Sequence, residues 1–130
     1  GSPLSCFMFV TYYDIGEVIK NCKHNTFCDD VTPYLSFPAA RWGKHVKMIQ
    51  KDLNKMQLWM EKWKMRFHPD KCGFMILDRR RNGKKRNAKW DVKLKIHDKY
   101  IDRVENGKCY GVHLDEKITF EQHAKVIYDK

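Results

Sequence analysis

The order of patterns along the chain predicts an α+β fold, because helical and strand-like segments follow one another without the regular alternation of an α/β protein. Residues 41–67 place apolar side chains every three or four positions, which is typical of one face of an α-helix. Two short β-rich segments meet at Asp29 and Asp30 and predict a β-hairpin. Residues 92–96 alternate apolar side chains with lysine, which predicts a strand with one buried face.

The first expected element is a mostly buried helix that ends near Lys20. Ser2 is a suitable N-cap, and Pro3 fits the first helical position because its missing N–H is not needed there. Apolar residues follow densely from Leu4 onward. Residues 21–25 are polar and predict a turn before the next element.

The hairpin is expected over residues 26–37, with its turn at Asp29 and Asp30. Its second strand contains Pro33, which has no N–H to donate to a ladder. We therefore expect Pro33 at a sheet edge or at a bulge.

The long helix is expected to end at His68, because the residue before Pro69 disfavours helical dihedral angles. Packing onto a sheet explains its apolar face more simply than a coiled coil, for which about three heptads are the minimum. The residues predicted to lie on the buried face are Val46, Ile49, Leu53, Met56, Met60, Trp63 and Phe67. The lysines that fall off this face are Lys47, Lys51, Lys55, Lys62 and Lys64.

Shorter elements are expected in the second half of the chain. Residues 72–77 are apolar and predict a buried strand. A turn near residues 97–99 follows the alternating strand, and residues 109–114 predict a further strand. A final helix begins near Thr119, which can serve as its cap.

The chain has 130 residues with 26 Lys and Arg against 16 Asp and Glu, so its formal net charge is +10. The hydrophobic content of 42% excludes a compositionally disordered chain. No apolar run approaches the roughly 20 residues of a membrane span, so no membrane partner is expected. The positive charge favours a polyanionic partner, nucleic acid before a membrane surface.

Residues 79–89 form the most basic stretch and predict a solvated loop. It lacks aromatic residues for base stacking, apart from Trp90 at its end, so any nucleic-acid binding there is expected to depend on phosphates alone. The alternative is a loop without a partner. Its candidate binding residues are Arg79, Arg80, Arg81, Lys84, Lys85 and Arg86.

Five cysteines make an odd count, which argues against the paired disulfides of small secreted domains. We therefore expect an intracellular location, nucleus or cytoplasm, with reduced thiols. Cys22, His24 and Cys28 are the closest approach to a zinc site, but a fourth ligand and the usual spacing are missing.

The adjacent Asp29 and Asp30 are the strongest candidates for chemistry. Carboxylates at the turn of a hairpin suit Mg²⁺, which takes one or two carboxylates together with phosphate oxygens of a substrate. Two-metal phosphoryl transfer uses such sites to hold the attacking and leaving oxygens. The alternative is an ordinary turn, in which Asp is common because its side chain binds nearby backbone N–H groups.

Four motifs, taken in order and spacing, resemble the second half of the palm of a reverse transcriptase. The closest likeness is to the enzymes of non-LTR (LINE-type, jockey-like) retrotransposons. That family shows a Gly-Ser-Pro-Leu-Ser-Pro loop, an aromatic-x-Asp-Asp hairpin, a helix followed by Asn-Pro-x-Lys, and a Leu-Gly-Val-x-Leu-Asp strand. The corresponding segments are Gly1-Ser2-Pro3-Leu4-Ser5, Phe27-Cys28-Asp29-Asp30, residues 63–77 and Gly111-Val112-His113-Leu114-Asp115.

The resemblance implies a Mg²⁺-dependent RNA-directed DNA polymerase that acts on an RNA template, a DNA primer and deoxynucleoside triphosphates. Asp29 resembles a catalytic metal ligand, with Asp30 as its less direct neighbour because consecutive strand residues point to opposite faces. Lys71 resembles a lysine proposed as general acid for the leaving pyrophosphate; the alternative is a surface lysine at a helix exit. Gly111 resembles part of the strand that supports the primer end. The loop that lines template and nucleotide corresponds to Ser2, Pro3 and Leu4.

The sequence also departs from the family pattern. Cys6 replaces Pro, His68 replaces Asn and Tyr110 replaces Leu, and Pro33 removes a ladder donor beside the Asp pair. The family's first metal aspartate precedes the region that Gly1 begins, so the chain is expected to be a fragment that is inactive alone.

We accordingly expect two parts, a partial palm over residues 1–78 and a following region over residues 79–130 with the basic loop, strands and C-terminal helix. A basic nucleic-acid-binding module without catalysis and a transposon relic without function are the alternatives.

Overall fold

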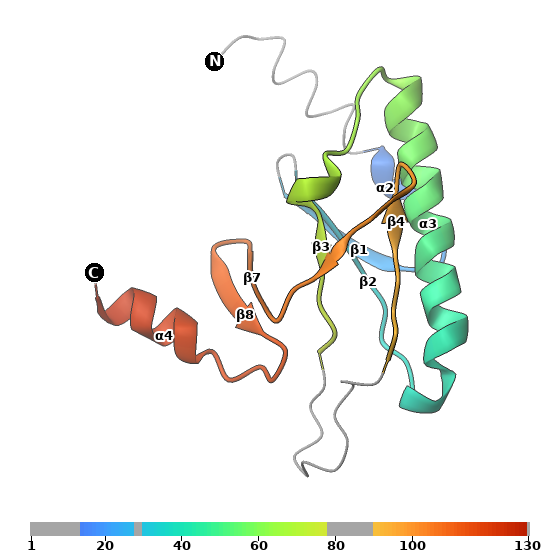
Figure 1. Cartoon of the computed structure of the whole chain (residues 1–130). Helices are drawn as coiled ribbons and strands as arrows, with labels where there is room; N and C mark the ends of the chain where they lie inside the picture. The colour runs from blue at the N-terminus through green and yellow to red at the C-terminus, as the bar shows by residue number, and fades with distance from the viewer. Residues whose placement is uncertain (1–13, 28–29, 78–89, 130) are drawn as a thin grey trace, which may run out of the picture. The chain divides into compact units, whose positions relative to one another are not determined.

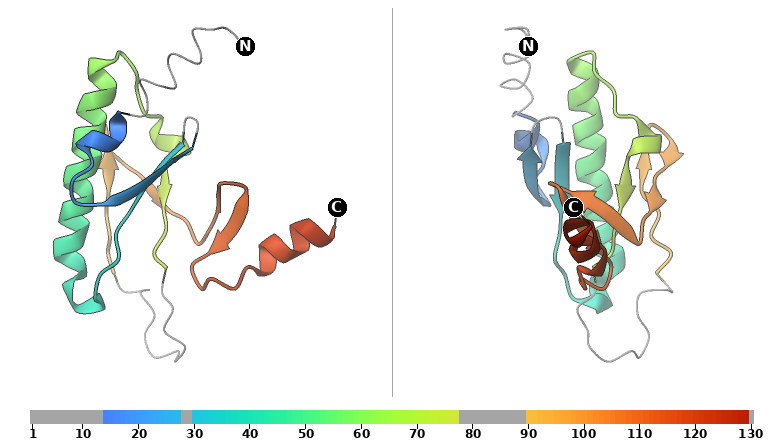
Figure 2. Two further views of the ribbon diagram at one scale, coloured as in Figure 1. Left: turned by 180° about the vertical axis from the view of Figure 1, so that it is seen from behind. Right: turned by 90° about the vertical axis from the view of Figure 1, so that its left-hand side faces the viewer.

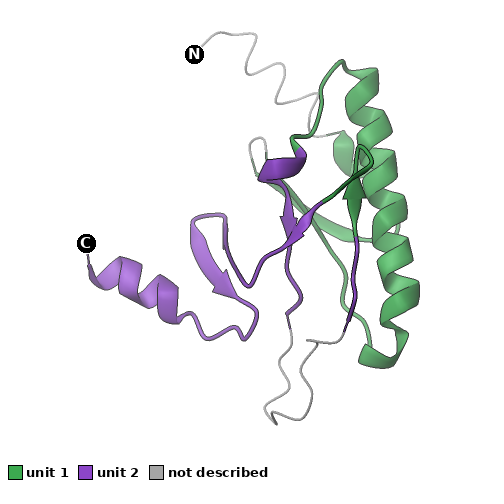
Figure 3. Cartoon of the chain, viewed as in Figure 1, with its two compact units in different colours: residues 1–68, 94–100 green, residues 69–93, 101–130 purple. Residues whose placement is uncertain are grey.

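The computed structural model describes residues 14–27, 30–77 and 90–129 (Figure 1). These residues form a mixed α and β structure, which is compatible with the predicted α+β class. The chain divides into two compact units, unit 1 with residues 1–68 and 94–100, and unit 2 with residues 69–93 and 101–130 (Figure 3). Among the described helices, none is both long enough and apolar enough to cross a membrane.

Unit 1 is built around the helix α3, Trp42–Lys62, as the apolar periodicity predicts. Its inner face buries Leu53, Met56 and Met60, which confirms the centre of the predicted stripe. The short helix α2, Ile15–Val18, and the strand β4, Lys95–Ile96, lie against this helix (Figures 1 and 2). These elements and the residues next to them contribute Ile15, Ile19, Leu94 and Ile96 to the core.

The end of α3 differs from the prediction, because the helix stops at Lys62 and not at His68. Lys64 adopts a left-handed conformation with φ 58°. Its N–H donates to the Glu61 carbonyl at 3.0 Å, and the Met65 N–H donates to the Met60 carbonyl at 2.9 Å. This pair of bonds is a Schellman motif, which ends a helix by satisfying its last carbonyls. Trp63 therefore leaves the stripe and is 45% exposed, so the prediction that it belongs to the core is wrong.

A hairpin is present in unit 1, but its position differs from the prediction, because Asp30, expected in the turn, is the first residue of the second strand. Strand β1, Lys23–Phe27, pairs antiparallel with β2, Asp30–Tyr34, from Lys23 opposite Tyr34 to Phe27 opposite Asp30. These two strands form a two-stranded sheet, so Pro33 lies in an edge strand as expected. The polar turn expected over residues 21–25 is wrong for its second half, which belongs to β1.

A second hairpin joins β4 to β5, Lys99–Tyr100, and confirms the predicted turn. His97 and Asp98 both have positive φ, 49° and 61°, as a type I′ turn requires. The burial of Leu94 and Ile96 between exposed lysines confirms the predicted alternation, but the strand itself covers only Lys95–Ile96 and not residues 92–96 as expected.

Glutamines of α3 hydrogen-bond the backbone of this hairpin. The Gln50 side chain accepts from the Lys95 N–H at 2.8 Å and donates to the Lys95 carbonyl at 3.0 Å. The Gln57 side chain accepts from the His97 N–H at 3.0 Å. An amide side chain can pair with a strand in this way because it carries the same donor and acceptor as a peptide group.

The described part of unit 2 contains a two-residue parallel pair and an antiparallel hairpin. Strand β3, Gly73–Phe74, pairs with β6, Asp102–Arg103, and is much shorter than the strand expected over residues 72–77. The residues expected as one strand over 109–114 are split by a turn, so that prediction is wrong. They belong to β7, Asn106–Cys109, and β8, Val112–Asp115, joined through Tyr110 and Gly111 at φ 50° and 82°.

The C-terminal helix α4, Glu121–Tyr128, is present close to its predicted start. Thr119 accepts a hydrogen bond from the Glu121 N–H through Oγ1 at 3.4 Å, although it stands one position before the cap. The first predicted helix lies largely outside the described residues, and its described part, α2, ends at Val18.

Candidate active site

The Asp pair belongs to the hairpin β1–β2. Phe27 closes β1 and pairs with Asp30, which opens β2, so Cys28 and Asp29 are the two residues between the strands. Asp30 is exposed, and so is Phe27, by 62%. The structure thus presents one carboxylate of the pair to solvent beside the end of a hairpin, whereas Asp29 and Cys28 lie outside the described residues.

The base of the hairpin is attached to α3 by Asp52, a residue that the sequence patterns did not single out. Its carboxylate accepts hydrogen bonds from the backbone N–H of Asn21 at 2.7 Å and of Cys22 at 2.8 Å, and from the Asn21 side-chain amide at 2.7 Å. Asp52 is only 1% exposed. Since Cys22 directly precedes β1, these bonds set where the hairpin leaves the core.

The environment of Asp52 shifts two pKa values in opposite directions. Burial alone raises the pKa of Asp52, but the N–H donors of Cys22 and Asn21 stabilise the anion and lower the pKa overall. Burial, followed by the nearby charge of Asp52, raises the pKa of the Cys22 thiol to about 12. The site therefore holds a carboxylate and a neutral thiol side by side, which is a structural arrangement and not that of an activated nucleophile.

The first strand also packs closely against α2. A Cβ added at Gly16 would collide with the imidazole of His24, which lies on β1. Glycine at this position thus allows the hairpin and the short helix to approach each other.

The other candidate residues that the structure describes lie in unit 2. Lys71 is an exposed residue at the end of a single 3-10 turn, Pro69–Lys71, whereas Asp30 belongs to unit 1. Gly111 lies in the turn between β7 and β8 and is exposed there.

Asp115, the last residue of the fourth motif, organises the loop between β8 and α4. Its carboxylate accepts from the backbone N–H of Lys117, Thr119 and Phe120 at 2.9 to 3.2 Å, and from the Thr119 hydroxyl at 2.9 Å. Desolvation opposes ionisation, but these donors outweigh it and lower the pKa of Asp115.

The remaining predicted residues lie outside the described ranges. They are Ser2, Pro3, Leu4, Asp29, Arg79, Arg80, Arg81, Lys84, Lys85 and Arg86. Within residues 14–27, 30–77 and 90–129, no three His, Cys, Asp or Glu side chains gather in a way that could hold a metal ion.

Comparison with known proteins gave no match to a family model, to a curated protein or to a solved structure.

Proposed function

We propose that the chain is part of an RNA-directed DNA polymerase of the non-LTR retrotransposon type. The observation that carries the proposal is the hairpin β1–β2, in which Phe27 and Asp30 of the second motif form the last pair of the ladder. The long helix α3 follows it, in the order that the resemblance implies. In this proposal the partial palm is formed by residues 1–78.

The proposed chemistry is Mg²⁺-dependent nucleotidyl transfer. Asp29 would bind Mg²⁺ together with phosphate oxygens of a deoxynucleoside triphosphate, and Asp30 would add negative charge beside it. Lys71 would donate a proton to, or stabilise the charge of, the departing pyrophosphate.

Metal binding tests the proposal without requiring activity. Mn²⁺ added to the full chain should broaden the NMR signals of backbone amides near Asp30 before those elsewhere. Asp29→Asn should reduce this broadening strongly. Asp98→Asn is the matched control, since Asp98 is an exposed aspartate in the turn of the hairpin β4–β5 and its replacement should leave the effect intact. Broadening that is absent from the hairpin, or equal in the two variants, would overturn the proposal.

Primer extension tests the polymerase assignment. The chain is incubated with a primed RNA template, Mg²⁺ and deoxynucleotides. Extension that Asp29→Asn abolishes and Asp98→Asn spares would support the assignment, whereas extension that Asp29→Asn leaves intact would contradict the proposed role of the Asp pair.

A further inference from the structure

The face of α3 opposite the core carries a row of lysines. At 100° per residue, their positions fall within an arc of about 80° on the side away from Leu53, Met56 and Met60. All five are exposed, and we refer to them as the lysine row: Lys44, Lys47, Lys51, Lys55 and Lys62. From first to last the row extends about 27 Å, at 1.5 Å per residue.

The charge of the lysine row is not balanced along α3. The two acidic residues of the helix are Asp52, which is buried, and Glu61, whose Oε1 lies 3.7 Å from His97 Nδ1. Within the described residues none of the five lysines has an ion-pair partner. Among the described residues of unit 1, no other helix or strand lies over this face of α3 in the two views of Figure 2.

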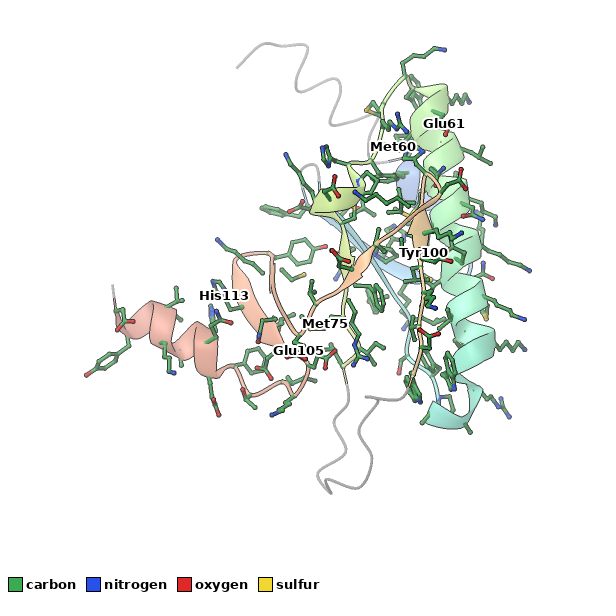
Figure 4. All side chains as sticks on the ribbon, in the orientation of Figure 1. Met60, Glu61, Met75, Tyr100, Glu105 and His113 are labelled. Atoms are coloured by element: carbon green, nitrogen blue, oxygen red, sulfur yellow. The ribbon has the colours of Figure 1, made fainter. Side chains whose placement is uncertain are left out.

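Aromatic surface lies near the C-terminal end of the row, where Trp63 directly follows Lys62 and stands about 100° round the helix axis from it. The rings of Trp59 and Trp63 are 6.1 Å apart, and Trp63 is 45% exposed. Met60 and Glu61, which Figure 4 labels, mark this end of α3. A surface that binds unpaired nucleic acid has two components. Lysines bind the phosphates along the strand, and an aromatic ring stacks on a base.

We propose that the lysine row binds the phosphate backbone of single-stranded nucleic acid, with Trp63 stacking on an unpaired base. The proposal goes beyond the polymerase assignment, because it places nucleic acid on α3 and involves neither the Asp pair nor a metal ion. It therefore stands or falls separately from that assignment.

The apolar face of the helix argues for nucleic acid over an anionic membrane. A helix that lies in a membrane surface inserts its apolar face among the lipids. In α3 that face is occupied by the core of unit 1. The outward face has a single exposed large apolar side chain, Leu58, which is 66% exposed and stands between Lys55 and Lys62.

The first test measures the salt dependence of binding in EDTA, so that metal chemistry does not contribute. The probe is a fluorescein-labelled 15-residue oligouridylate, and the protein is the full chain. If five phosphates are neutralised, log K should fall with log[salt] at a slope of about −3.5. The triple variant Lys47→Gln, Lys51→Gln, Lys55→Gln should reduce that slope by about 2 and weaken binding on the order of tenfold or more at 0.1 M salt.

The matched control removes the same charge elsewhere. Lys108, Lys117 and Lys125 are exposed residues of unit 2, and their triple replacement by Gln should change the slope little. Equal losses in the two triple variants would show that net charge alone drives binding and would overturn the proposal. Circular dichroism melting of each variant separates loss of binding from loss of fold.

The second test adds a charge to the row. Leu58→Lys fills the gap between Lys55 and Lys62 and should steepen the slope by about 0.7. Gln122→Lys, on the exposed surface of α4, adds the same charge and should leave the slope unchanged.

The stacking role of Trp63 has its own test. Trp63→Ala should weaken binding roughly fivefold or more with the slope unchanged. Binding to vesicles with 30% phosphatidylserine but not to the oligonucleotide would overturn the proposal in favour of a membrane partner.

Discussion

Asp52 is the only charged side chain that is buried among the described residues. A buried carboxylate is tolerated only when hydrogen bonds replace its water, and here three N–H donors do so. Every other ionisable residue of Trp42–Met60 is a lysine or histidine. The one aspartate beside the apolar stripe was therefore the only sequence signal that could have indicated a buried carboxylate. Its donors lie 30 and 31 positions earlier in the chain, and no local pattern points to them.

The first prediction concerns Asp52→Asn. The new amide places its own N–H₂ against N–H donors, so we expect the free energy of unfolding at pH 7 to fall by about 2–4 kcal/mol. Asp98→Asn, at an exposed turn, should change it by less than about 0.5 kcal/mol. Urea unfolding followed by circular dichroism measures both.

The same pair of variants gives a pH test. Since the pKa of Asp52 is lowered in the folded state, its contribution is present above the ordinary pKa of 3.8 and is lost as the pH falls through the folded-state value. The gap between the native chain and Asp52→Asn should therefore narrow on acidification below about pH 4. A gap that stays constant down to pH 2 would contradict this role.

The second prediction compares two glycines that differ in what surrounds them. Gly16→Ala should lower the free energy of unfolding by about 1–3 kcal/mol, because the new methyl group meets His24. Gly43→Ala should raise it by about 0.5–1 kcal/mol, because nothing lies within 4 Å of that position and alanine favours the helix. Thermal and urea unfolding measure both variants. If Gly16→Ala and Gly43→Ala change the free energy of unfolding in the same direction, the packing of β1 on α2 is refuted.

At the level of elements, the end of α3 shows where local periodicity stops being informative. The apolar spacing continues through Trp63 to Phe67, yet the chain leaves the helix at Lys62. The Schellman bonds of Lys64 and Met65 satisfy the last carbonyls, and a lysine at positive φ gives no sequence signal comparable to glycine. The hairpin turn at Tyr110 and Gly111 interrupted a predicted strand for a similar reason, because Tyr110 also adopts positive φ.

The third prediction concerns this helix end. Lys64→Gly should stabilise the chain by about 0.5–1 kcal/mol, because glycine adopts the left-handed conformation without strain. Lys62→Gly, in the last helical turn, should destabilise it by a similar amount, because glycine disfavours helical backbone. Thermal melting of both variants decides the point, and a loss of stability in Lys64→Gly would argue against the observed helix end.

At the level of the molecule, unit 1 holds nearly all of the buried core. Of the described residues, Ile101 is the one buried hydrophobic residue of unit 2, and α4 buries none. The strand β4 belongs to unit 1 although it follows the first segment of unit 2 in the sequence, and Gln50 binds Lys95 across 45 positions. Stability should accordingly differ between the units, since local opening costs least where few apolar side chains are buried.

The fourth prediction is the resulting pattern of hydrogen exchange. Amides of α3 around Leu53 and Met56 should exchange at least about 100-fold more slowly than those of α4 under native conditions. Amides of β4 should follow α3. Equal protection of α3 and α4, measured by NMR or mass spectrometry, would refute this distribution of stability.

The local patterns were sufficient for the elements whose signal repeats along the chain. The centre of the buried face of α3, the presence of a hairpin that includes Asp30 and the alternating burial before His97 follow from periodicity and turn chemistry, because each depends on neighbours within a few positions. The reverse transcriptase assignment likewise rests on sequence motifs and stays a proposal.

Contacts between distant segments carried no such signal. The anchoring of the hairpin by Asp52, the parallel pairing of β3 with β6, the exposure of Trp63 and the division into two units depend on residues far apart in sequence. A side chain's periodic position predicts which face it occupies, but burial and hydrogen bonding depend on what the folded chain brings against that face. Asp52 illustrates the difference, since its position follows from the helix and its burial from Asn21 and Cys22.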